Sequence, residues 1–132
     1  MGRLILAALL APVFYGILQF PGNMALLSLY PAAAEPAFDA PMSYLLLGLC
    51  FSFVYGTFAG FCSAWVAGGD PRKAGVASGT ILLLVGIAVQ TAYWDQLPLW
   101  WHLVFLAAIV PMAMLGAQLR GTLGKAADLE PG

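Results

Sequence analysis

Charged residues are absent from the interior of four long apolar stretches of this sequence, and this absence defines its class. Only 8% of the 132 residues are Asp, Glu, Lys or Arg, against about 25% in an ordinary globular chain. Each stretch exceeds the roughly 20 residues with which a helix crosses a hydrocarbon layer of about 30 Å. The stretches lie between Arg3 and Glu35, Asp39 and Asp70, Lys73 and Asp95, and Asp95 and Arg120. The sequence therefore predicts an all-α integral membrane protein, with four transmembrane helices in a single domain over residues 1–132.

The groups that catalysis or metal binding requires are also scarce. His102 is the only histidine, and Cys50 and Cys62 fall in one stretch, too far apart along a helix to form a disulfide. No Asp, Glu or Cys stands at metal-binding spacing around His102, and no nucleophile–base pair or phosphate-binding loop is present. We therefore expect no enzymatic activity, no metal and no cofactor. A net charge of −1 gives no reason to expect nucleic acid as a partner.

The five basic residues lie in only some of the segments that flank the apolar stretches, and this distribution predicts the orientation of the chain in the membrane. Arg3 precedes the first stretch, Arg72 and Lys73 separate the second from the third, and Arg120 and Lys125 follow the fourth. The other two connections carry only acidic residues. Cytoplasmic loops are enriched in Lys and Arg, so both termini are predicted to be cytoplasmic, in what we expect to be a bacterial cytoplasmic membrane.

The spans are predicted at approximately 4–29, 42–67, 71–93 and 98–119, followed by a frayed tail. Proline removes a helical hydrogen bond, so we expect the first span to break near Pro21, leaving 24–30 as a short interfacial segment. Gly68 is expected to end the second helix, with Asp70 and Pro71 starting the third. This short connection predicts a tight antiparallel hairpin of helices two and three.

A row of small residues follows one face of the second span. Removing side-chain bulk at every fourth position lets another helix approach closely, which is a main source of helix attraction in lipid. The third span offers a shorter match, so we expect the two to pack together, with a second subunit as the alternative. These helix-packing residues are Gly48, Ser52, Gly56, Gly60, Ala64 and Gly68, with Gly75 and Gly79 in the third span.

Several polar and aromatic residues are predicted at a similar height near the outer surface, from the 1.5 Å rise per residue. They could form a shallow pocket, or each could simply reach interfacial water. The residues of this predicted outer pocket are Gln19, Asn23, Tyr44, Gln90, Trp94, Trp101 and His102.

Three functions remain open from the sequence. The packing row favours a non-catalytic accessory or self-associating subunit, whose partners are the lipid bilayer and other membrane subunits or itself. The alternative is a small transporter or channel that uses the polar outer residues, and the third is a haem- or quinone-associated subunit using His102. The chain has the size of small multidrug transporters and dimeric fluoride channels, but it lacks the intramembrane glutamate of the first and any motif of the second.

Overall fold

The computed structural model describes residues 1–35 and 38–129, and this part of the chain is helical without any strand. Four helices are each long and apolar enough to cross a membrane, so the prediction of four helices of membrane-spanning length and composition is confirmed. Short 3₁₀ turns, η1 (Pro31–Ala34) and η2 (Trp94–Gln96), lie in two of the connections. The long helices are α1 (Gly2–Leu29), α2 (Met42–Ala67), α3 (Pro71–Ala92) and α4 (Leu99–Leu129).

The α2–α3 connection has the predicted capping residues. Gly68 adopts a left-handed conformation, φ 68°, and its N–H donates to the carbonyl of Ala64. Asp70 then caps α3 by accepting a hydrogen bond of 2.9 Å from the backbone N–H of Arg72, with Pro71 in the first turn. The glycine has no Cβ to oppose the left-handed turn, and proline has no N–H to leave unsatisfied at a helix start.

A predicted helix break and a predicted helix end are wrong. Helix α1 continues through Pro21 to Leu29 instead of breaking there, and Leu26, beyond the proline, is buried. Unravelled backbone is costly in lipid, so packing on both sides of Pro21 holds the helix together. Helix α4 does not fray after residue 119 but extends to Leu129, and Gly121 lies against Pro71 at the start of α3.

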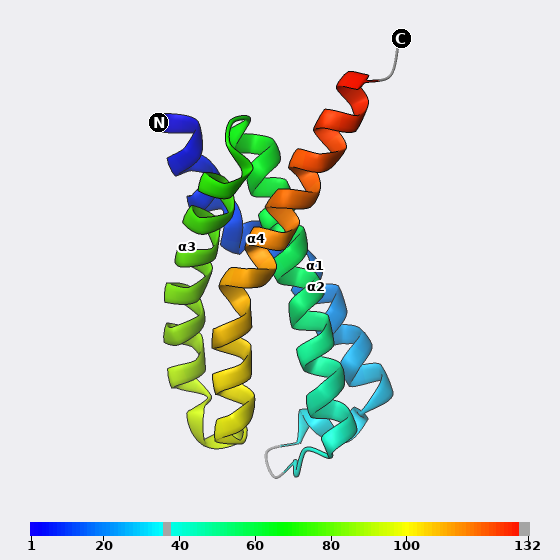
Figure 1. Ribbon diagram of the computed structural model, residues 1–132. Coiled ribbons are helices and arrows are strands. Elements are labelled where there is room, and N and C mark those ends of the chain that lie inside the picture. The colour runs from blue at the N-terminus through cyan, green and yellow to red at the C-terminus, as the bar shows by residue number, and fades with distance from the viewer. Residues whose placement is uncertain (36–37, 130–132) are drawn as a thin grey trace.

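The four helices form a bundle in which α4 contacts α2 and α3, and α1 contacts the same two helices from the opposite side. Both termini lie at one end of the bundle, and the η1 and η2 connections lie at the other (Figure 1). The contact between α2 and α3 is much less extensive than the contacts that each makes with α4. The expected tight pairing of α2 with α3 is therefore not confirmed.

Glycines at the α2–α4 crossing explain this arrangement. A Cβ added at Gly60 would overlap the backbone carbonyl of Ala113, and one added at Gly116 would overlap the backbone carbonyl of Thr57. Each helix thus presents a glycine to the other's main chain. Helix α4 supplies a small-residue face of its own, which gives α2 a closer partner than α3 can offer.

Candidate functional site: a polar cavity between the four helices

The predicted packing row of α2 divides into two parts along the helix. Gly56, Gly60 and Ala64 are buried; a Cβ at Gly56 would lie 3.2 Å from Met112 Cβ, and Ala64 belongs to a buried cluster with Ala117. Gly75 and Gly79 of α3 also face α4, on Met114 and Val110 respectively. Gly68 lies beside the guanidinium of Arg3 instead. The row is therefore largely covered by this chain's own α4.

Gly48 and Ser52, at the other end of the row, line a cavity of about 220 Å³ between the helices. This central cavity lies toward the bundle end opposite the termini, and all four helices contribute to it. Small side chains at these two positions leave the space open instead of filling it. The Ser52 hydroxyl donates to the carbonyl of Gly48 at 2.8 Å, which satisfies it within its own helix.

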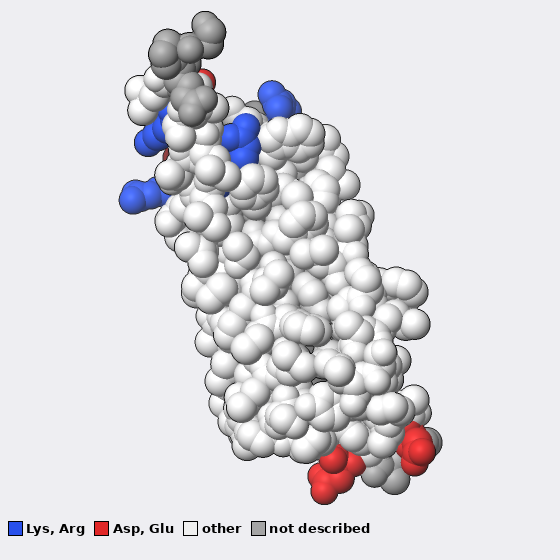
Figure 2. Space-filling view, turned by 90° about the vertical axis from the view of Figure 1, so that its right-hand side faces the viewer, with Lys and Arg blue, Asp and Glu red and all other residues white. Residues whose placement is uncertain are grey.

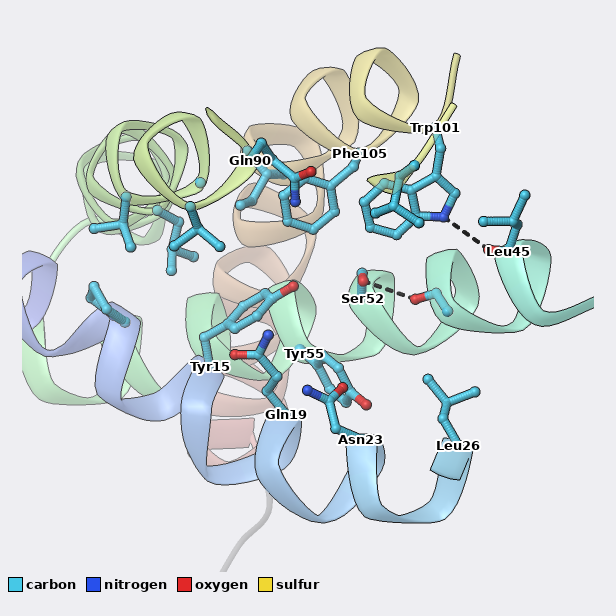
Figure 3. Close-up of a pocket in the computed structure, with 18 of the residues that line it drawn as sticks. Tyr15, Gln19, Asn23, Leu26, Leu45, Ser52, Tyr55, Gln90, Trp101 and Phe105 are labelled. Carbon is cyan, nitrogen blue, oxygen red and sulfur yellow. Dashed lines mark hydrogen bonds between the residues drawn. The ribbon is translucent and has the colours of Figure 1, made fainter. Parts of the chain in front are cut away.

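Five of the seven residues predicted for an outer pocket line this cavity, namely Gln19, Asn23, Tyr44, Gln90 and Trp101. Figure 3 shows Gln19 and Asn23 on α1, with Gln90 and the aromatic residues of α4 on the opposite side of the cavity. Trp94 and His102 do not line the cavity. The amide side chains of α1 and α3 therefore line one cavity, and His102 lies outside its lining.

His102 is fully buried, with 0% of its surface exposed, and both of its ring nitrogens have neighbours. Nε2 lies 3.1 Å from the carbonyl oxygen of Trp94, and Nδ1 lies against the side-chain amide of Gln90. The ring also stacks on the indole of Trp94 at a centroid distance of 4.6 Å. His102 thus closes the α3–α4 turn and holds the Gln90 side chain at the cavity edge.

The contact with His102 determines which group Gln90 presents to the cavity. The Gln90 atom at Nδ1 is the side-chain carbonyl oxygen, which can only accept a hydrogen bond, so an N–H at Nδ1 donates to it. The Gln90 NH2 group is then left as a hydrogen-bond donor for the cavity that Gln90 lines.

Aromatic rings form the rest of the cavity wall. Trp101 and Phe105 of α4 stack with their rings 5.3 Å apart and 6° from parallel, and the Trp101 indole N–H donates to the carbonyl of Leu45 at 3.0 Å. Facing them, Tyr15 of α1 meets Tyr55 of α2 edge to face at 5.5 Å. The cavity therefore has flat apolar walls with amide and hydroxyl groups between them.

The sequence analysis missed Tyr15 and Tyr55 and assigned Ser52 to packing alone. Tyr15 could have been identified from the sequence, because Tyr15, Gln19 and Asn23 stand at every fourth position and share one face of α1. Tyr55 is 6% exposed, and its hydroxyl is the buried side-chain atom without a hydrogen-bond partner in the described chain. That hydroxyl lies against Gly22, where an added Cβ would overlap it.

The described residues that line the cavity include no Asp, Glu, Lys, Arg or His. Within residues 1–35 and 38–129 no group of three His, Cys, Asp or Glu side chains could hold a metal ion. What the lining offers is hydrogen-bond donors and acceptors without charge. Such a site can bind and orient an uncharged molecule through these groups.

No protein-family model, curated protein or solved structure matches this chain.

Proposed function

We propose that this chain is a non-catalytic membrane protein that binds a small uncharged molecule with a planar ring in its central cavity. The observation that carries the proposal is a 220 Å³ cavity with aromatic walls and three side-chain amides. An apolar cavity of about 150 Å³ already holds benzene, so this volume suits one substituted ring. The amides of Gln19, Asn23 and Gln90 would orient its polar groups.

The proposed orientation places both termini in the cytoplasm of a bacterial cell and the cavity in the outer half of the membrane. Figure 2 shows Lys and Arg gathered at one end of the molecule together with a few acidic atoms, an uncharged band along its length, and only Asp and Glu as charged residues at the opposite end. This distribution supports the orientation, because basic residues favour the cytoplasmic side of a membrane.

The packing row no longer favours the accessory or self-associating subunit over a ligand-binding protein. That expectation rested on the small-residue row of α2 together with the scarcity of catalytic groups, and α4 of the same chain covers Gly56, Gly60 and Ala64 of this row. The haem-associated alternative needs a free nitrogen on His102, and both ring nitrogens have partners. A transporter that uses the same cavity stays compatible with the proposal, because transport begins with binding.

Binding is best tested with two probes that lack a long tail, duroquinone as a ring with acceptors and 4-propylphenol as a ring with a donor. The purified chain in phosphatidylcholine nanodiscs is titrated, and saturable binding is read from its thermal midpoint, which a ligand of the native state raises. Gln19→Leu and Gln90→Leu should weaken binding at least tenfold. Gln118→Leu is the matched control, because Gln118 is exposed on α4 and does not line the cavity. If neither probe binds saturably, or if Gln118→Leu weakens binding as much as the cavity variants, the proposal is wrong.

A further inference from the structure

The walls of the central cavity are unequally covered. On the α2 and α4 sides the lining residues Leu45, Tyr55 and Phe105 are 6%, 6% and 8% exposed. On the α3 side Val85 and Val89 also line the cavity, yet they are 42% and 44% exposed. Residues that both line a cavity and reach the surface mark its opening.

The opening lies between the outer parts of α1 and α3. Deeper in the bundle these helices are closed, since Ala11 of α1 and Leu82 of α3 are 0% and 3% exposed and belong to one buried cluster. Further along, Asn23 of α1 lines the cavity and is exposed, as Val89 is on α3. The two helices therefore separate toward the end of the bundle that carries η1 and η2.

The depth of this opening indicates what it faces. Val85 and Val89 lie about 18 Å and 24 Å of helix rise beyond Lys73, at 1.5 Å per residue, which is within a hydrocarbon layer of about 30 Å. No charged residue lies between Lys73 and Asp95. The mouth of the cavity is consequently lined with valine and surrounded by lipid chains, with an amide of α1 at its outer edge.

We infer that the natural ligand is a lipid-soluble amphiphile with an uncharged ring as its head and a long apolar tail. The ring occupies the cavity between the aromatic walls and the amides, and the tail leaves between α1 and α3 past Val85 and Val89 into the outer leaflet. This inference rests on the proposed function and adds the source of the ligand, the membrane itself. A water-soluble ring of the same size would gain nothing from a mouth that opens to lipid.

A pair of probes that differ only by the tail tests this inference. Decyl-substituted trimethyl-1,4-benzoquinone and duroquinone are bound to the protein in phosphatidylcholine nanodiscs, and dissociation constants are expressed relative to probe in the lipid. Val89→Phe narrows the mouth because it places a bulkier side chain there, and it adds no charge. It should weaken binding of the decyl probe at least tenfold more than binding of duroquinone, and Val85→Phe should do the same.

Leu84→Phe is the control on the same helix, because Leu84 is 59% exposed and does not line the cavity; it should leave both probes unchanged. Duroquinone binding by each variant shows that the variant is folded. Equal effects of Val89→Phe on the two probes, or none on either, would overturn the tail path while the proposed function stands. Failure of the parent protein to bind either probe would instead overturn the proposed function.

Discussion

The Nδ1 atom of His102, on the first turn of α4, lies against the side-chain amide of Gln90 on the last turn of α3. The histidine is completely buried, and the glutamine is 7% exposed. Gln90 lines the cavity, and His102 contacts the Trp94 carbonyl in the connection between α3 and α4. The pair therefore links the stability of the α3–α4 turn to the position of a polar group in the proposed binding site.

A double-mutant cycle should detect this link. His102→Phe keeps a ring against Trp94 but leaves the Gln90 amide without its partner, and Gln90→Leu leaves Nδ1 without its own. Each single change is expected to lower the free energy of unfolding by about 1–3 kcal/mol, the cost of a buried polar group left unsatisfied. The double variant should lose less than the sum, with a coupling of about 0.5–3 kcal/mol. Unfolding in mixed micelles, followed by circular dichroism, measures all four proteins, and strict additivity would show that the two side chains do not interact.

The α2–α4 crossing should not tolerate even one added methyl group. Gly60→Ala and Gly116→Ala each bring a Cβ into the partner's backbone, which cannot move aside as a flexible side chain can. Each change is expected to cost about 1–3 kcal/mol or more, as overpacking does. Gly16→Ala is the matched control, since nothing lies within 4 Å of its Cβ position, and it should be neutral or slightly stabilising because Ala favours helix. Thermal midpoints in detergent compare the three, and equal midpoints would contradict the close crossing.

The number of helices was predictable because a charge inside lipid is costly, which leaves Lys, Arg, Asp and Glu at the helix ends. The identity of the packed neighbours was not. A row of small residues on α2 indicates that some helix approaches closely, but Gly75 and Gly79 of α3 were as suitable a match as Ala113 and Gly116 of α4. Only the three-dimensional arrangement shows that the rows on α2 and α3 both face α4.

Height along the helices could be predicted for the polar residues, and rotation about the helix axes could not. The fixed rise per residue brought Gln19 and Gln90 to a common level, and both line the cavity. His102 lies at a similar level but faces the α3–α4 turn, because its ring is held by Trp94 in η2. The conformation of this short connection has no simple sequence signal. The predicted helix break at Pro21 was wrong for a related reason, because the sequence does not show that residues beyond the proline are packed in the bundle.

Tyr55→Phe is expected to be neutral or to stabilise the protein. The Tyr55 hydroxyl has no partner among the described residues, and a buried unsatisfied polar group costs about 1–3 kcal/mol. Removing the oxygen keeps the edge-to-face contact with Tyr15. The thermal midpoint of the purified variant measures the effect. A loss of stability of more than about 1 kcal/mol, the usual worth of a hydrogen bond, would show that the hydroxyl is bonded after all.

The proposed topology predicts which loops are accessible from outside the cell. In a background with Cys50 and Cys62 replaced by alanine, a single cysteine is introduced as Glu35→Cys or Lys73→Cys. Glu35 lies just after η1 and Lys73 in the first turn of α3, at opposite ends of the bundle, and both are exposed. A membrane-impermeant maleimide should label the Glu35→Cys protein in intact cells and the Lys73→Cys protein only after permeabilisation. Labelling of the Lys73→Cys protein in intact cells, with the Glu35→Cys protein unlabelled, would show that the orientation is the reverse of the proposed one. The cavity would then open to the inner leaflet, and its ligand would have to be sought there.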